Sequence, residues 1–187
     1  MSRQAAHLRS ASPADASAIA EVYIESWRSS YRGLIPEPVL DGMNALKQTS
    51  DWWGVLCRSE PGRGAVAAVD DAGRVFGFAS FGPARQGQAG DCGEVYTLYL
   101  LAARQGRGSG RRLLAAAARR LRAAGFRSLA VWALADNPAC AFYEHLGGIA
   151  GERRTITIGG TGLHEVCYLW PELGPLTGHL LAAEEAP

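Results

Sequence analysis

The sequence is organised around one segment, EVYTLYLLAARQGRGSGRR, which spans residues 94–112. Its first half is apolar and aromatic, which predicts a strand, and its second half is rich in glycine and leads into a long Ala/Leu/Arg helix. Glycine recurs at Gly106, Gly108 and Gly110, where the lack of a side chain lets a ligand approach the main chain. Such a loop at a helix start offers unpaired N–H groups and the positive end of the helix dipole, which suits phosphate. Nearby cations add to this attraction: Arg104, Arg107, Arg111 and Arg112.

The spacing of the glycines separates the known classes of phosphate-binding loop. No Gly-Lys-Ser/Thr follows Gly106 at the distance that a P-loop requires, and Arg111 stands where the third glycine of a dinucleotide fingerprint should fall. The pattern Gln105-x-x-Gly108-x-Gly110 after a strand resembles the pyrophosphate-binding loop of the GNAT superfamily of N-acetyltransferases, which hold acetyl-coenzyme A (acetyl-CoA) there. The resemblance implies pyrophosphate contacts from Gln105, Gly106, Arg107, Gly108, Ser109, Gly110 and Arg111.

Length, composition and charge limit the class of protein. A chain of 187 residues, 48% hydrophobic and 20% charged, suits one domain with a sizeable core, which we place at residues 1–170, with 171–187 as a C-terminal tail. The net charge of +1 argues against a general nucleic-acid binder. No apolar run approaches the ~20 residues of a membrane span, and the N-terminus lacks a signal-peptide core. We therefore expect a cytoplasmic protein that associates with neither membrane nor nucleic acid.

The residues that commonly bind metals are scattered. Cys57, Cys92, Cys140 and Cys167 form no C-x-x-C pair, so neither a metal site nor a disulfide framework is expected. His145 and His164 stand alone in the sequence, which favours surface positions or hydrogen-bonded packing over metal ligation.

Hydrophobic periodicity and turn residues predict an alternation of strands and helices. Ser12, Pro13 and Asp15 form a helix start, and Gly33 is a natural terminator of that helix. The predicted strands are residues 7–10, 65–69, 75–81, 94–101, 128–134, 155–158 and 165–170. Further helices are predicted at 39–43, 46–57, from the glycine segment to 125, and at 139–146, with a loop at 83–93 and a loosely held tail after 171. This order predicts an α/β fold in which a mixed sheet carries helices on both faces.

A second motif extends the resemblance. The segment Asp136-Asn137-Pro138-Ala139-x-x-Phe142-Tyr143-Glu144-x-Leu146-Gly147 is similar to the second GNAT signature, and it follows the first in the family's order. The resemblance implies the GNAT fold, a mostly antiparallel sheet of about seven strands, and it implies that Asn137 touches the pantetheine arm and Tyr143 the thioester sulfur. The segment Trp27-Arg28-x-x-Tyr31-Arg32-Gly33-Leu34-Ile35-Pro36 resembles a GNAT branch whose substrates are mostly unassigned.

The resemblance and the chemistry together assign catalytic roles. Amide formation from a thioester needs a neutral amine and a proton for the departing sulfur. Tyr143, with an ordinary pKa of about 10, is protonated at neutral pH and can act as the general acid. The resemblance gives the strand residues Leu98, Tyr99 and Leu100 contacts with the pantetheine arm, by the logic of strand addition. Glu94 begins the same strand and is one candidate for the general base; water is the other.

The acceptor is not identified by the sequence. Trp27, Tyr31 and Tyr96, together with Trp52 and Trp53, are candidates for the aromatic wall of an amine pocket, although some of these residues can equally belong to the core. The predicted function is N-acetylation, with acetyl-CoA as cosubstrate and without metal, of a small-molecule or peptide amine. The alternative is a non-catalytic acyl-CoA sensor or interaction domain on the same fold. Dimers are common in the resembled family, so a homodimer is the oligomer to test.

Overall fold

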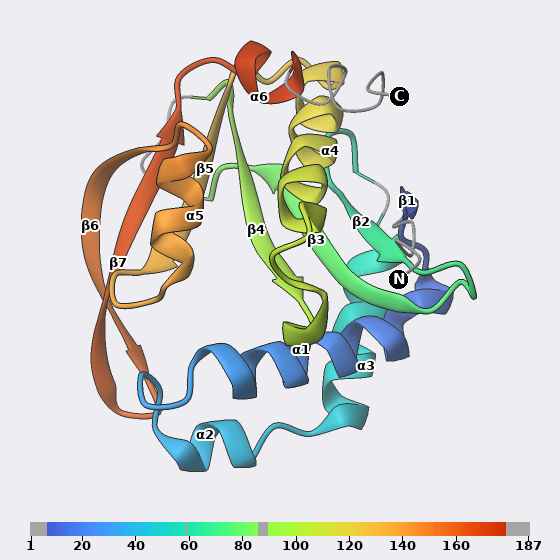
Figure 1. Cartoon of the computed structure of the whole chain (residues 1–187), viewed down its shortest axis with the longest axis vertical. Coiled ribbons are helices and arrows are strands. Elements are labelled where there is room, and N and C mark those ends of the chain that lie inside the picture. The colour runs from blue at the N-terminus through green and yellow to red at the C-terminus, as the bar shows by residue number, and fades with distance from the viewer. Residues whose placement is uncertain (1–6, 59, 86–89, 179–187) are drawn as a thin grey trace.

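The computed structural model describes residues 7–58, 60–85 and 90–178. The strands are β1 (His7–Ser10), β2 (Gly64–Val69), β3 (Val75–Pro83), β4 (Cys92–Leu100), β5 (Ser128–Leu134), β6 (Ile149–Ile158) and β7 (Thr161–Trp170). The α-helices are α1 (Ala16–Ser30), α2 (Glu37–Asp41), α3 (Ala45–Leu56), α4 (Ser109–Ala123), α5 (Ala139–His145) and α6 (Gly174–Gly178). Two 3-10 turns, η1 (Pro13–Asp15) and η2 (Ala102–Arg104), precede α1 and α4. Figure 1 shows the arrangement of these elements.

The sheet has seven strands in the order β1-β2-β3-β4-β5-β7-β6. All neighbouring strands pair antiparallel except β4 and β5, which run parallel. That parallel contact is short, because only residues 92–94 of β4 pair with 128–130 of β5. Beyond it the two strands diverge and leave a gap in the middle of the sheet (Figure 1). The predicted fold class, a mostly antiparallel mixed sheet flanked by helices, is confirmed.

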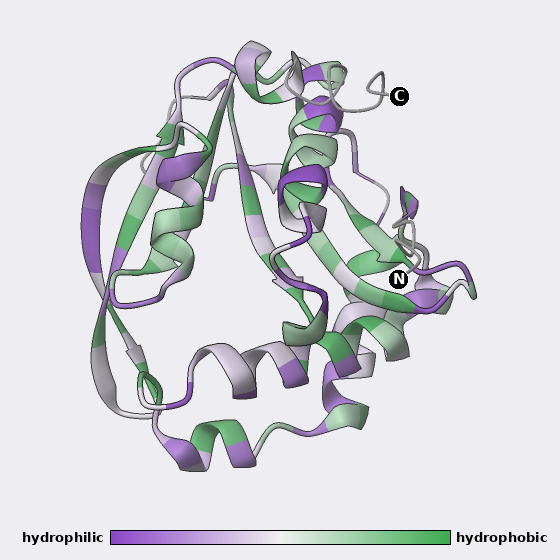
Figure 2. Ribbon diagram, in the orientation of Figure 1, coloured by the Kyte–Doolittle hydropathy of each residue, from purple (hydrophilic) through white to green (hydrophobic). Residues whose placement is uncertain are grey.

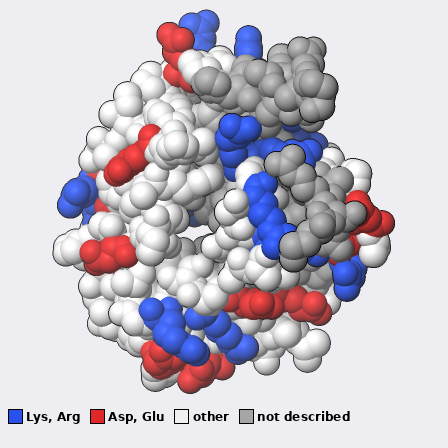
Figure 3. Space-filling view, in the orientation of Figure 1, with Lys and Arg blue, Asp and Glu red and all other residues white. Residues whose placement is uncertain are grey.

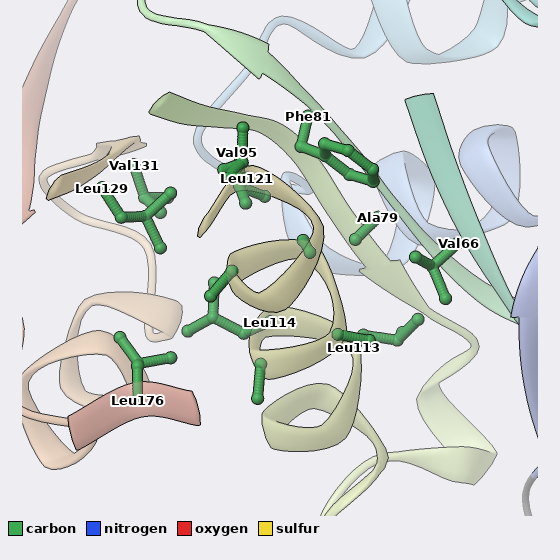
Figure 4. Close-up of a cluster of buried hydrophobic side chains, with 14 of the residues drawn as sticks. Val66, Ala79, Phe81, Val95, Leu113, Leu114, Leu121, Leu129, Val131 and Leu176 are labelled. Carbon is green, nitrogen blue, oxygen red and sulfur yellow. The ribbon is translucent and has the colours of Figure 1, made fainter. Parts of the chain in front are cut away.

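Helix α4 supplies the larger of the two main cores. Its residues 113–118 are all buried, and Leu113, Leu114 and Leu121 pack against strand residues that include Val95 and Leu129 (Figure 4). Full burial of one leucine side chain stabilises the fold by roughly 1.5–3 kcal/mol relative to exposure. The alanines between these leucines have short side chains, which lets the helix lie close to the sheet. Figure 2 shows hydrophobic residues along the central strands and hydrophilic ones along the connection from β4 to α4.

The opposite face of the sheet is covered by α1 and α3. Ile19 and Val22 of α1 and Trp52 of α3 pack with Phe78 of β3, and the rings of Trp52 and Phe78 meet edge to face at 4.9 Å. Trp52 therefore belongs to this core, whereas its neighbour Trp53 is 53% exposed. Neither tryptophan lines the cavity between β4 and β5 described below.

The predicted helix start at residue 12 is confirmed with one change of geometry. Residues 13–15 form the 3-10 turn η1, and the regular helix begins at Ala16. The carboxylate of Asp15 accepts a hydrogen bond from the Ser12 amide at 2.8 Å and two from Arg9, at 2.8 and 2.7 Å. A side chain thus satisfies donors at the start of the helix, as capping requires.

Several predicted boundaries were wrong. Residues 83 and 92–93 belong to strands rather than to the loop predicted at 83–93, of which 86–89 lie outside the described residues. Strands β6 and β7 are longer than predicted and only Gly159 and Gly160 separate them. Strand β6 was underestimated because it is an edge strand whose first five residues are exposed, so its sequence shows no apolar alternation.

The segment after Trp170 is more ordered than predicted. Leu173 is 2% and Leu176 7% exposed, both within the α4 core, and Arg122 of α4 donates to Thr177 Oγ1 at 3.2 Å. Leu173 and Leu176 thus bring α6 onto the end of α4. The division into a domain at 1–170 and a tail stays a prediction, and 179–187 lie outside the described residues. Among the described residues we find no helix with the length and apolar character needed to cross a bilayer.

Candidate active site

A cavity of about 860 Å³ lies where β4 and β5 diverge. Residues 95–100 of β4 and 131–133 of β5 form two of its walls, and the loop before α4, the start of α5 and the end of α1 complete it. The space-filling view shows a hollow near the middle of this face, with Lys and Arg side chains gathered on one side of it over the start of α4 (Figure 3). The short β4–β5 pairing therefore opens the sheet to a ligand instead of closing it.

The glycine loop forms one end of this cavity. Gly108 is the N-cap of α4 and has a φ of 80°, in the left-handed region that favours glycine. The first bond of the helix runs from the Arg112 amide to the Gly108 carbonyl at 3.1 Å. For the amides of residues 106–111 we find no acceptor among the described residues. These N–H groups and the helix dipole together form a site for an anion.

Gly110 allows the start of α4 to lie against both neighbouring elements. A Cβ atom at this position would be 3.3 Å from Leu100 of β4 and 3.3 Å from Phe142 of α5. Contacts of that length are tighter than ordinary packing, so a side chain would push the elements apart. The glycine therefore holds the anion site close to β4 and α5.

The arginines near the loop have different roles. Arg111 lines the cavity and is exposed. Arg104 lies within 3.5 Å of Asp70, and its guanidinium lies 5.0 Å from the centre of the Phe76 ring. Arg104 therefore binds the β2–β3 hairpin and holds the loop in place, while Arg111 contributes charge to the cavity.

Tyr143 of α5 forms another part of the cavity wall. Its ring packs beside Tyr168, at 5.5 Å between centroids, and Trp170, at 6.3 Å. The residue is 6% exposed and lines the cavity, and we find no hydrogen bond from its hydroxyl to another described residue. Burial raises the pKa of Tyr143, with smaller contributions from Tyr31 and Cys140, so the phenol stays protonated.

Tyr31, Tyr99 and Asn137 form a polar cluster where α1, β4 and α5 meet. The Asn137 Oδ1 atom accepts from the Ala139 amide at 2.9 Å and so caps the start of α5. The Tyr31 and Tyr99 hydroxyls are 3.2 Å apart, and Trp27 Nε1 donates to Tyr99 at 3.0 Å. Burial raises the pKa of Tyr31, while hydrogen bonds to Tyr99 and Asn137 oppose that rise. The cluster fixes the position of α5 relative to the cavity.

Glu94 is buried and fully engaged. It is 1% exposed, and its carboxylate accepts from the Arg85 amide and from Arg85 Nε, both at 2.9 Å, and also from Arg85 Nη2. It does not line the cavity. A second carboxylate, Glu165 of β7, is paired in the same way with Arg154, whose Nη2 lies 2.7 Å away.

Comparison with known proteins then assigns the family. The chain matches the family model of the acetyltransferase (GNAT) family over residues 19–148. It belongs to the GNAT family. A curated relative, the uncharacterized N-acetyltransferase YuaI of Bacillus subtilis (strain 168), is 40% identical over 169 residues, which cover 90% of this chain and 95% of the relative.

Solved GNAT structures share the fold. The PaiA N-acetyltransferase of Thermoplasma acidophilum, in complex with coenzyme A, superposes with a TM-score of 0.67 at 18% identity, over 87% of this chain and 98% of that one. A phosphinothricin acetyltransferase of Sinorhizobium meliloti, in complex with acetyl-CoA, gives 0.65 at 24% identity, over 89% and 88%. At these identities the similarity supports the architecture and not the acceptor.

In this GNAT chain most of the site residues predicted from the sequence gather around one cavity. Those that line it are Tyr31, Tyr96, Leu98, Tyr99, Leu100, Gln105, Gly106, Gly108, Gly110, Arg111, Asn137 and Tyr143. Those that do not are Trp27, Glu94, Arg107 and Ser109. Their catalytic and binding roles stay predictions. Among the described residues no group of three or more His, Cys, Asp or Glu is placed to hold a metal ion.

Thr97 and Trp132 are among the cavity residues that the sequence reasoning did not assign to the site. The register between β3 and β4 shifts at Ser80 and Phe81, which pair with Thr97 and Val95 and leave Tyr96 as the extra residue. Thr97 then bonds to Ser80, with the two hydroxyl oxygens 2.7 Å apart. A bulge of this kind changes the face of the sheet toward which a side chain points, and no residue pattern in β4 predicts it.

Proposed function

We propose that the protein transfers the acetyl group of acetyl-CoA to a primary amine. The observation that carries this proposal is that one cavity is lined by Tyr143 and by four residues whose amides have no acceptor among the described residues: Gly106, Gly108, Gly110 and Arg111. The amides suit a diphosphate, and the phenol suits a leaving thiolate. Membership of the GNAT family supports the reaction class.

The residues present fit coenzyme A. The related structures with coenzyme A and acetyl-CoA support this ligand. The amides near Gly108 and the Arg111 side chain would hold the pyrophosphate. The Leu100 carbonyl already accepts from Ser26 Oγ at 3.3 Å and Gln105 Nε2 at 3.1 Å. Leu98 is therefore the better candidate for main-chain bonds to the pantetheine arm.

The proposed chemistry needs one acid and one route for the amine proton. Bound acetyl-CoA supplies a thioester, on which the carbon–nitrogen bond forms as the carbon–sulfur bond breaks and sulfur leaves with the electron pair. Tyr143 donates its proton toward that sulfur and recovers one from solvent. Because burial raises its pKa, the phenol is in the donating form across the physiological range.

We propose that water takes the amine proton. Glu94, the other candidate, has both carboxylate oxygens bonded to Arg85 and lies outside the cavity lining. A carboxylate that is already paired with a guanidinium is a poor proton acceptor, because protonation would break a charge-assisted interaction. Glu94 instead holds Arg85, just beyond the end of β3, against the sheet.

Release of free thiol tests the function. Purified protein, acetyl-CoA and a set of primary amines should give amine-dependent thiol release, followed with a thiol reagent. Tight acetyl-CoA binding without thiol release with any amine would instead support the alternative, a non-catalytic acyl-CoA sensor or interaction domain. A cytoplasmic location, a small-molecule or peptide acceptor and a homodimer stay predictions.

A further inference from the structure

A second cavity, of about 530 Å³, adjoins the first. Tyr96 and Thr97 of β4 line both cavities, so the bulge of that strand is a wall common to the two. Trp52 and Leu56 of α3 and Ser80 of β3 form other parts of its wall. The second cavity therefore lies between this shared wall and the elements α3 and β2.

The charged side chains of this second cavity are mostly basic. Its lining contains four arginines and a single acid: Arg58, Arg63, Arg85, Arg120 and Glu60. Glu60 is paired with Arg63, whose Nε lies 2.7 Å from its Oε2, and Arg85 is paired with Glu94. For Arg58 and Arg120 we find no ion pair with a described residue. A cleft lined by one sign of charge concentrates ligands of the opposite sign.

The two ion-paired arginines pack on the wall that the cavities share. The guanidinium groups of Arg85 and Arg63 lie 4.8 and 5.5 Å from the centre of the Tyr96 ring. The Tyr96 hydroxyl donates to the Pro83 carbonyl at 2.6 Å and so holds the ring in place. Arg120 Nη2 donates to Ser10 Oγ at 3.1 Å.

The carboxylates near the shared wall are already paired with arginines and are not available to bind a second ammonium group of an acceptor. Glu94 is bonded to Arg85, and Glu165 to Arg154, as described above. The guanidinium of Arg154 also lies 3.9 Å from the centre of the Trp132 ring, in the wall of the first cavity. An acceptor with several ammonium groups would therefore meet arginines where it needs unpaired acids.

We infer that the acceptor is a small primary amine that also carries an acidic group such as a carboxylate. Its nitrogen reaches the first cavity past Tyr96 and Thr97, while its acidic group lies in the second cavity among Arg58, Arg63 and Arg120. This inference rests on the proposed acetyl transfer and adds the charge class of its substrate. It separates amino-acid-like acceptors from polyamines and aminoglycosides, which have the opposite charge.

The experiment compares two series of amines matched in length. One series consists of ω-amino carboxylates, from glycine to 8-aminooctanoate, and the other of α,ω-diamines of the same chain lengths. n-Hexylamine, whose distal end carries no charge, serves as the reference. We expect the best carboxylate to exceed its matched diamine by at least about tenfold in kcat/KM, a difference of the size that one nearby charge produces. Equal or greater rates with the diamines would overturn the inference.

A matched pair of variants locates the effect. Arg58→Glu should lower kcat/KM for the preferred carboxylate by about tenfold and leave that for n-hexylamine within twofold. Arg153→Glu is the control, since Arg153 is an exposed residue of β6 that lines neither cavity and the change in net charge is the same. Equal losses with carboxylate and hexylamine, or equal losses in the two variants, would contradict the inference.

Direct binding keeps this test separate from that of the proposed function. Calorimetry on the coenzyme A-saturated protein should show carboxylates bound more tightly than diamines, whether or not thiol is released. Charge-selective binding without turnover with any amine would refute the transferase and preserve the charge assignment. Turnover of n-hexylamine with no preference between the two series would support the transferase and refute the charge assignment. If neither series bound or reacted, the inference would be overturned, while acetyl-CoA binding in the same preparation would still report on the coenzyme site.

Discussion

The two halves of β4 serve different purposes within one strand. Residues 92–94 pair with β5 and are bonded on the other side to the end of β3 and the residue that follows it, and they bury Glu94 at 1% exposed. Residues 95–100 have β3 alone as a strand partner and line the cavity. A polar group in the first half is satisfied by the protein itself, whereas the second half borders the cavity in which we propose that acetyl-CoA binds. The position of a residue along β4 thus decides whether it is buried in the sheet or faces the cavity.

The largest expected effect is on acetyl-CoA binding, and it concerns the loop that follows the cavity-lining half of β4. Gly108→Asp places a carboxylate at the proposed pyrophosphate site, and a like charge about 4 Å away costs about 4 kcal/mol at an effective dielectric constant of 20. We expect acetyl-CoA to bind roughly 1000-fold more weakly in calorimetry.

The control for this variant is Gly73→Asp in the β2–β3 turn. The φ values of Gly73 and Gly108 are 77° and 80°, and a Cβ atom at either would meet nothing within 4 Å. Both variants should therefore lose about 1 kcal/mol of stability from the left-handed backbone. Normal acetyl-CoA affinity in Gly108→Asp would remove the pyrophosphate site from the loop.

Tyr143→Phe tests the catalytic end of the open cavity. Loss of the proton donor should lower kcat by about 100-fold, while acetyl-CoA affinity stays within about threefold. Thermal stability should change little, because we find no hydrogen bond from this hydroxyl to another described residue. Stopped-flow thiol release and calorimetry together measure both quantities. Unchanged kcat would exclude Tyr143 as the acid.

Glu94→Gln tests the paired half of β4. The substitution keeps the size of the side chain but weakens its charge-assisted bonds from Arg85, so the free energy of unfolding should fall by about 2 kcal/mol and the melting temperature by roughly 4–8 °C. We expect kcat to fall by less than about fivefold, an outcome opposite to that of Tyr143→Phe.

Glu165→Gln is the matched control for this prediction, because Glu165 is also paired with an arginine and is more exposed, at 15% of its side chain. It should lose less stability than Glu94→Gln. A 100-fold loss of kcat in Glu94→Gln with unchanged stability would make Glu94 the base after all.

The smallest expected effect concerns the pH dependence of kcat. A general acid works while it is protonated, so a raised pKa extends its active range upward. Because burial raises the pKa of Tyr143, kcat should not fall through loss of this proton as the pH rises toward the ordinary tyrosine value of about 10. The pH profile of single-turnover thiol release measures this. A decline centred at or below that value, present in the native protein and absent from Tyr143→Phe, would show that the pKa of Tyr143 is not raised.

The reliable predictions from the sequence were those based on local chemistry. The strand at Ser128–Leu134 was predicted at its observed bounds, because a short apolar run between polar turns permits little else. The start of α1 followed from Ser12 and Asp15, whose side chains act within a few residues of the chain. Residues 149–154 of edge strand β6 and the packed segment after Trp170 were missed, because exposure and docking depend on neighbours that are far away in the sequence.

For the site, the sequence by itself determined the groups available: glycines that open the amides of a helix start, and a phenol on the helix after β5. Only the tertiary structure decided how they are used. It separated β4 from β5 after three residue pairs, paired Glu94 with Arg85, turned Trp27 to Tyr99, and brought the basic cavity beside Tyr96. The physical reason is that local signals fix hydrogen bonds within a few residues, whereas burial, ion pairing and cavities arise between segments distant in the chain.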